Sequence, residues 1–130
     1  MEADEPERMP ASGPRPRAIA VERHAPGVMV VTLRGEHDLS TRPELGEALA
    51  RAAEDASVLV DLSECDFIDS TVIGALVVAF QTVTERGRLF ALTIPADAKA
   101  VQRVARVAGL ATFLTIHETR EAGLASVSAP

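Results

Sequence analysis

An acidic residue, a serine and a threonine stand side by side at Asp69, Ser70 and Thr71, immediately before an apolar run. This grouping allows three chemistries for the serine. Ser70 could cap a helix by accepting an N–H hydrogen bond, attack a substrate as a nucleophile, or accept a phosphate group. Capping is the simplest of these, because Ser and Asp are favoured at helix N-termini. The residues alone leave capping and phosphate acceptance open.

The nucleophile hypothesis has little support from the neighbouring residues. A serine nucleophile at a strand-to-helix elbow typically has glycines two residues away on each side, and these positions hold Ile68 and Val72. A histidine base is also needed, and no spacing brings one to Ser70; the histidines are His24, His37 and His117. A serine hydrolase is therefore the distant alternative, and we expect the protein not to be an enzyme.

Composition argues against several kinds of partner. The chain has 13 basic and 19 acidic residues, a net charge of -6, four Phe and no Trp or Tyr. An acidic chain without an aromatic platform is not expected to bind nucleic acid or an anionic membrane. Cys65 is the only cysteine and the histidines are scattered, so we expect no metal site and no cofactor, and we interpret His37 as a solvated loop residue. We interpret Cys65 as a small buried hydrophobe in a cytoplasmic protein.

The first 17 residues differ in composition from the rest. They hold four of the eight prolines and several acids but almost no aliphatic side chains. Such a segment cannot bury enough apolar surface to offset the cost of ordering it. We therefore predict a disordered leader over 1–17 and a single domain over 18–127.

The domain begins with signals for a hairpin and a helix. Two β-rich runs, 19–23 and 28–33, flank the turn sequence HAPG and are expected to give way to a loop at Gly35. Thr41 and Glu44 have the spacing of a capping box. With Pro43 in the first turn, they predict a helix that runs to about residue 54.

Buried strands and helices alternate after that point. The expected elements are a strand at 57–63, the loop ECDFID, a helix at 70–85 ended by Gly87, a strand at 88–94, a helix at 97–108 followed by Gly109, a strand at 113–117 and a helix at 119–125. The pattern ββαβαβαβα predicts an α/β fold in which a mixed central sheet of about five strands packs against about four helices.

Three stretches resemble one known family. The run VLVDLSECDFIDSTVIGALV is similar to the central motif of the STAS domain, the fold of anti-sigma factor antagonists and of the cytosolic tails of sulfate transporters. VVTLRGEHDL resembles the second strand and the Gly-x-x-Asp loop of that family. AKAVQRVARVAGLATFLTIHET resembles its late helix and last strand. The resemblance covers about residues 19–124.

The resemblance implies a function for Ser70. In bacterial antagonists of this family, the serine of the Asp-Ser pair is phosphorylated by a partner that is both an anti-sigma factor and a serine kinase. The unphosphorylated protein binds this partner and releases a sigma factor; a serine phosphatase reverses the modification. By this resemblance Ser70 is the phosphorylation site, and the partner-binding residues are Asp38, Asp69, Ser70, Thr71 and Gly74. Gly35 matches a position in the same loop.

One residue departs from the family pattern. Many members have a glycine two places after the phosphorylated serine, whereas this chain has Val72, with Gly74 two places later. A β-branched side chain there is expected to narrow the first turn and alter access for the kinase. An alternative function within the family is a STAS scaffold subunit of a stress-signalling or lipid-transport complex.

Overall fold

The structure is a computed structural model that describes residues 15–128. Most of the predicted disordered leader lies outside the described residues. The described part holds five strands in the order β1-β2-β3-β4-β5, with β1 antiparallel to β2 and all other neighbours parallel. The elements are β1 (Ala18–Ala25), β2 (Val28–His37), the 3-10 helix η2 (Leu39–Thr41), α2 (Arg42–Ala52), β3 (Ser57–Ile68), α3 (Ser70–Glu85), β4 (Phe90–Thr93), α4 (Lys99–Val107), the 3-10 helix η3 (Leu110–Thr112), β5 (Thr115–His117) and α5 (Arg120–Val127). The predicted mixed α/β sheet and the order ββαβαβαβα are confirmed.

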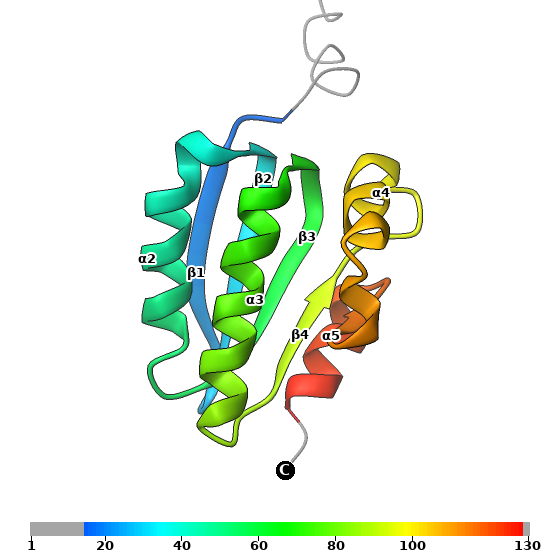
Figure 1. Ribbon diagram of the computed structural model, residues 1–130. Helices are drawn as coiled ribbons and strands as arrows, with labels where there is room; N and C mark the ends of the chain where they lie inside the picture. The colour runs from blue at the N-terminus through cyan, green and yellow to red at the C-terminus, as the bar shows by residue number, and fades with distance from the viewer. Residues whose placement is uncertain (1–14, 129–130) are drawn as a thin grey trace, which may run out of the picture.

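The helices pack on both faces of the sheet. Figure 1 shows α2 and α3 side by side across one face, and α4 joins their hydrophobic core through Val101 and Ala105. A second, smaller apolar cluster joins Val127 and Leu124 of α5 to Val30 and other residues of β2, β3 and β4. Because both faces are covered, the central strand reads as a continuous aliphatic run.

Two strands extend further than their sequences suggest. β2 continues through Gly35 to His37, and β3 continues to Ile68, although both stretches were expected to be loops. The two extensions pair with each other, with Glu36 opposite Phe67 and His37 opposite Ile68, and the register shifts before them. Each polar stretch is extended because the other supplies its hydrogen-bonding partner, and local sequence carries no signal of that pairing.

The expected capping box at the start of α2 is wrong. Thr41 is the N-cap of α2 but makes no side-chain capping hydrogen bond, whereas Pro43 does lie in the first turn. The Thr41 hydroxyl instead donates to Asp38 O at 3.1 Å and accepts from Asp38 N at 3.3 Å. Asp38 and Thr41 form the capping box of η2, one turn earlier. The backbone of Asp38, three residues earlier, therefore engages the hydroxyl that the predicted capping box with Glu44 required.

The later helices agree closely with the sequence pattern. α3 spans the predicted residues, and Gly87 follows it in the left-handed conformation with a φ of 75°. Gly109 ends α4 in the same way, with a φ of 69°. α4 is shorter than the predicted 97–108; its buried residues are Val101 and Ala105, and Ala108 is exposed after the helix has ended.

Candidate functional site

Asp69 caps α3 at the carboxyl end of β3. Its backbone is extended, and its Oδ1 accepts hydrogen bonds from Thr71 N at 3.0 Å and Val72 N at 3.2 Å. Ser70 is the first residue of the helix, so it is not the cap. The capping role considered for Ser70 belongs to its neighbour.

The hydroxyls of Ser70 and Thr71 have different environments. Thr71 Oγ1 donates to Asp69 Oδ1 at 2.6 Å. Ser70 is exposed, and its Oγ forms no hydrogen bond with any residue in the range 15–128. Of the two hydroxyls, that of Ser70 is the one open to a reagent from solvent.

The Asp69 carboxylate is held in its charged form. Burial alone would raise its pKa, but hydrogen bonds from the Thr71 hydroxyl and from the backbone N–H groups of Val72, Thr71 and Leu39 lower the pKa below the ordinary value of 3.8. Leu39 belongs to η2, so this carboxylate also links α3 to the loop after β2.

The loop after β2 brings Asp38 to the same edge of the sheet. Asp38 Oδ1 accepts from Ser40 Oγ at 2.6 Å and from Ser40 N at 2.9 Å. The Ser40 hydroxyl, the Ser40 N–H and the nearby Arg17 guanidinium lower the pKa of Asp38, whose other oxygen lies 3.9 Å from Arg17 Nη2. The loop is therefore built around a charged aspartate.

The chain before β1 crosses this edge above Gly35. Gly35 has a φ of 77°, and a Cβ there would lie 2.7 Å from Arg15 O and 2.9 Å from Arg17 Cα. Only glycine permits both the left-handed backbone and this close approach. Arg15 N and Nη1 then hold the two carboxylate oxygens of Asp66 at 2.8 and 2.7 Å.

The three histidines are not gathered at Ser70. His37 is buried, contrary to its interpretation as a solvated loop residue; its ring nitrogens lie 2.8 Å from Arg34 O and 3.2 Å from Thr41 Oγ1. His24 is exposed in β1, and His117 is on β5, where its Nε2 is buried without a described partner. His37 is a structural residue that supports the loop after β2.

Two acids of β3 that precede Ser70 in the sequence, Asp61 and Glu64, are engaged away from it. Asp61 is buried and accepts from Arg120 Nη1 at 2.8 Å, beside α5. Glu64 pairs with Arg34. Each of these charges is compensated by an arginine, as are those of Asp38 and Asp66, so Asp69 is the acid beside Ser70 that has no paired cation in the range 15–128.

Val72 and Gly74 point to opposite sides of α3. Val72 is fully buried in the main core, so it does not narrow the surface beside Ser70, contrary to expectation. Gly74 is exposed one turn after Ser70, and a Cβ added there would meet nothing within 4 Å. The surface one turn beyond Ser70 is therefore smooth.

Exposed apolar side chains also lie near this polar edge, and no sequence pattern had predicted them. Leu39, Phe67 and Val78 are 67%, 39% and 56% exposed. Phe67 lies on the paired end of β3, Leu39 lies in η2 two residues after the end of β2, and Val78 follows Ser70 and Gly74 along α3. We call these six residues the Ser70 surface: Asp38, Leu39, Phe67, Ser70, Gly74 and Val78. Val78 is eight residues after Ser70, two helical turns along the same side of α3, and this spacing was the available signal for it.

A groove continues from this surface between α2 and α3. Its volume is about 410 Å³, and Val78 forms part of its wall. Half of the other residues that line it are small: Gly46, Ala50, Ala53, Ala75 and Ala79. Small residues on both helices keep the groove open next to the Ser70 surface.

Residues 15–128 give no structural basis for a metal centre or a membrane span. No three histidine, cysteine or acidic side chains in this range are grouped as metal ligands. None of the helices in it combines the length and the hydropathy needed to cross a bilayer. Cys65 is buried, and burial raises the pKa of its thiol to about 11.

A family model described as "Mlab, STAS domain" matches residues 20–116. A comparison with curated proteins gave no match. Among solved structures, the chain is similar to an anti-sigma factor antagonist from Mycobacterium paratuberculosis, with 25% identity and a TM-score of 0.77 over 88% of this chain and 96% of that one.

Two further solved structures share the fold at lower identity. An anti-sigma-factor antagonist (STAS) domain protein from Planctomyces limnophilus is 21% identical, with a TM-score of 0.72 over 85% of this chain and 98% of that one. The phosphorylated form of the Bacillus cell fate determinant SpoIIAA is 17% identical, with a TM-score of 0.64 over 83% and 97%.

Proposed function

The chain belongs to the STAS domain family, and on that premise we propose that it is an anti-sigma factor antagonist controlled by phosphorylation of Ser70. In its unphosphorylated form it binds an anti-sigma factor that is also a serine kinase, and a sigma factor is released. Phosphorylation by the kinase ends the association, and a serine phosphatase restores it. The observation that carries the proposal is the exposed Ser70 hydroxyl, which no described residue engages, on the capped first turn of α3.

The contacts around the helix start favour Ser70 over Thr71 as the acceptor. A kinase must reach the hydroxyl and accept its proton, and the Thr71 hydroxyl already donates to Asp69 at 2.6 Å. Phosphorylation of Thr71 would break this contact and place a phosphate against the capping carboxylate. Phosphorylation of Ser70 leaves the Asp69 cap and the helix start unchanged, so the fold is expected to survive the modification.

Charge explains how a phosphate would end partner binding. A phosphoserine adds about two negative charges at neutral pH, next to the Asp69 carboxylate. Two N–H groups of the first turn are already bound to Asp69, so the phosphate cannot use them. The two arginines at this edge, Arg15 and Arg17, already contact Asp66 and Asp38. A partner that covers the site would have to desolvate the dianion, which costs several kcal/mol unless it supplies a cation.

The Ser70 surface has the composition of a protein interface. Leu39, Phe67 and Val78 supply apolar contact area around a polar centre. Gly74 lets a partner approach the helix backbone closely, because no side chain intervenes. Such a binding module needs no catalytic group of its own, and we propose that the protein has none and acts in the cytoplasm.

A second candidate is a STAS subunit that scaffolds a larger stress-signalling or lipid-transport complex. The observation that favours it is the groove between α2 and α3, which extends the contact area well beyond Ser70. In that case a partner helix would occupy the groove, and phosphorylation would tune the assembly rather than dissolve it.

A kinase assay tests the first proposal. The protein is incubated with ATP and each anti-sigma kinase candidate of its own organism, and phosphorylated residues are mapped by mass spectrometry. We expect modification at Ser70 with at least one candidate. Ser40 is a matched control, since it is an exposed serine at the same edge whose hydroxyl is bound to Asp38. Ser40→Ala should be modified normally, whereas Ser70→Ala should not be modified.

Binding measurements complete the test and separate the two candidates. We expect Ser70→Ala to bind the kinase permanently and Ser70→Glu to bind it poorly while remaining folded. Absence of phosphate on Ser70 with every candidate, together with equal binding by Ser70→Glu and wild type, would refute the phosphorylation switch. Recovery from cell extract only with subunits of a larger complex, unaffected by Ser70→Glu, would support the scaffold instead.

A further inference from the structure

α4 carries an excess of positive charge on an acidic chain. The chain has a net charge of -6, yet the nine residues of α4 include no acid and three cations, which we call the α4 cations: Lys99, Arg103 and Arg106. They are spaced by four and three residues, so they are neighbours on the helix surface and repel each other. Five other arginines form ion pairs with acids, whereas the α4 cations form none with any residue of 15–128. An acidic group that covers this face would remove the repulsion.

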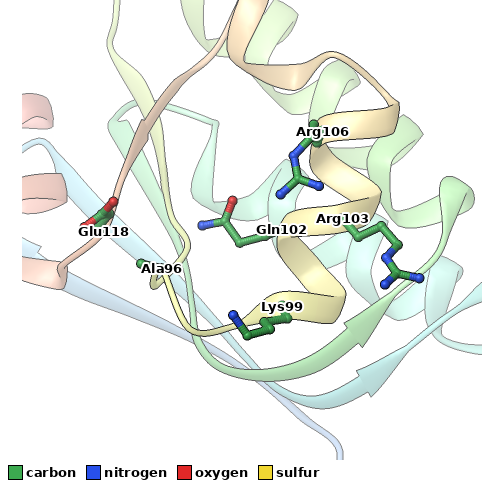
Figure 2. A pocket seen from close by; sticks show the side chains of 6 residues that line it. All are labelled: Ala96, Lys99, Gln102, Arg103, Arg106 and Glu118. Carbon is green, nitrogen blue, oxygen red and sulfur yellow. The ribbon is translucent and has the colours of Figure 1, made fainter.

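The α4 cations stand around a cavity at the carboxyl ends of β4 and β5. Its volume is about 370 Å³, and it is lined by Ala96, Lys99, Gln102, Arg103, Arg106 and Glu118. Figure 2 shows Lys99 and Arg106 extending toward the loop that carries Ala96, with Arg103 on the other flank of the helix. One acid, Glu118, faces three cations, so the rim of the cavity keeps a positive excess.

The described chain begins beside α4. Arg15 and Lys99 both line a second cavity, of about 270 Å³. Arg15 is fixed there, because its N and Nη1 donate to the two carboxylate oxygens of Asp66 at 2.8 and 2.7 Å. Figure 1 shows the start of β1 and α4 at the same end of the sheet. Residues 1–14 therefore join the described chain next to the first turn of α4.

Residues 1–14 carry the opposite charge. Their acids lie within a run of six residues, which we call the acidic run: Glu2, Asp4, Glu5 and Glu7. Arg8 is the only base in 1–14, and runs of like charge are frequent interaction segments. With few aliphatic side chains to bury, the segment has charge as its main means of binding. The two cations that follow it in the chain, Arg15 and Arg17, already pair with other acids.

We propose that the acidic run binds the α4 cations of the same chain. Eight residues separate Glu7 from Arg15, and an extended chain spans up to about 3.3 Å per residue, which gives a reach of about 26 Å. The α4 cations span about 10.5 Å along the helix axis, at about 1.5 Å per residue. All three are thus within reach of the run. The tether makes the binding intramolecular, so exposed ion pairs that are weak singly act together.

The bound run covers α4 and leaves the Ser70 surface open. The charged Asp69 carboxylate beside Ser70 repels an acidic segment, whereas the α4 cations attract it. No step uses the phosphorylation of Ser70, so the inference does not depend on the proposed function. Its consequence is that an acidic segment of another protein must displace the run before it can bind α4.

Lys99 is the only lysine of the chain, which allows a direct test on the full chain. A zero-length carbodiimide reagent joins an amine to a carboxylate only where the two groups touch. Trypsin then releases residues 1–8 as one peptide with all four acids of the run, and modified Lys99 lies in the peptide 89–103. We expect these two peptides to be joined. A mixture of 14N- and 15N-labelled protein should give no mixed-isotope product, because the contact is within one chain.

Charge variants identify the groups that bind. Arg103→Gln with Arg106→Gln keeps Lys99 as the reactive amine and should lower the yield of the joined peptides about tenfold. Arg23→Gln with Arg51→Gln is the matched control, since both are exposed cations without an ion pair to any residue of 15–128, and it should leave the yield unchanged. The melting temperature of each variant reports whether it is folded.

A second pair of variants tests the acidic run. Neutralising the run by Glu2→Gln, Asp4→Asn, Glu5→Gln and Glu7→Gln should move the amide signals of residues 99–107 in 1H–15N spectra. The control removes the same number of charges from exposed acids that have no ion pair within 15–128, by Glu44→Gln, Glu47→Gln, Glu54→Gln and Glu85→Gln. It should leave those signals in place. Octaglutamate should bind the neutralised run variant about tenfold more tightly than wild type, because wild type must first release its own segment.

Three results would overturn the inference. The first is a Lys99 that joins Glu118 or Asp66 but not the peptide 1–8. The second is a joined product with both isotopes in the proportion of random pairing, which would make a second copy of the chain the source of the acids. The third is a folded variant with a neutralised run whose signals at residues 99–107 and affinity for octaglutamate equal those of wild type.

Discussion

Asp69 Oδ1 accepts a hydrogen bond from the Thr71 hydroxyl, with 2.6 Å between the two oxygens. Ser70, which lies between these residues in the sequence, takes no part in the contact. The same oxygen also caps the first turn of α3. The Asp69 side chain thus stabilises the start of α3, and the Ser70 hydroxyl is left available for modification. A modification of Ser70 can then change the surface without changing the fold.

Asp69 and Ser70 should differ strongly in their effect on stability. Asp69→Ala removes the cap of α3 and is expected to lower the free energy of unfolding by about 0.5 to 2 kcal/mol. Ser70→Ala should change it by less than about 0.5 kcal/mol, as for an ordinary surface position. Urea unfolding followed by circular dichroism measures both. Equal losses for the two variants would mean that the serine hydroxyl is also structural.

The cap should weaken in acid. The folded-state pKa of Asp69 lies below its ordinary value of 3.8, so the folded protein binds this proton less readily than the unfolded chain does. Its stabilising contribution is complete above that ordinary value and is lost as the pH falls through the folded-state pKa. Asp69→Asn keeps a capping side chain without this charge. The stability difference between wild type and Asp69→Asn should therefore shrink below pH about 4; a constant difference from pH 7 to pH 2 would contradict this.

Substitution of Gly74 should leave the protein stably folded, but a large side chain there should weaken partner binding. Its side of α3 is open, and alanine is favoured over glycine in a helix, so Gly74→Ala is expected to raise the free energy of unfolding by about 0.5 to 1 kcal/mol. A larger side chain, as in Gly74→Gln, should leave the fold intact and weaken partner binding at least tenfold. Gln81→Ala, on an exposed later turn of the same helix, is the control. Normal binding by Gly74→Gln would remove Gly74 from the interface.

Gly35 should tolerate no side chain. Gly35→Ala forces a left-handed conformation on a residue with a Cβ, at a cost of about 1 to 2 kcal/mol, and also places that atom 2.7 Å from Arg15 O. We expect a loss of stability above this range unless Arg15 moves away and its contact with Asp66 breaks. Thermal unfolding and the amide shift of Asp66 distinguish these responses. Gly87→Ala shares the left-handed backbone without the close contact and should lose less.

Cys65 should be inert in the folded protein. Its side chain is buried and its thiol pKa is raised to about 11, so almost no thiolate exists at neutral pH. Reaction with a disulfide reagent such as DTNB is expected to follow the rate of unfolding at pH 8 and to become immediate in denaturant. Rapid labelling of the native protein would show that the ends of β2 and β3 open readily.

Local patterns predicted much of this fold, and the errors have a common origin. The boundaries of α3, its glycine terminator and the order of elements follow from apolar periodicity and capping residues. The prediction that GEHDL and ECDFID form loops was wrong, because these two stretches become strands by pairing with each other, 30 residues apart in sequence. His37 was misplaced for the same reason, since the buried contacts with Arg34 and Thr41 exist only once that loop has closed.

The sequence by itself determined that an Asp-Ser-Thr group begins a helix after a buried strand, and its resemblance to the STAS domain determined which of these residues to examine. Only the tertiary structure decided which one caps the helix, that Val72 faces the core, and that Leu39 and Phe67 border Ser70. It also decided that three cations of α4 stand around a cavity with Glu118 opposite. The reason is physical: capping and periodicity act over a few residues along the chain, whereas burial, pairing and charge compensation depend on neighbours that are distant in sequence.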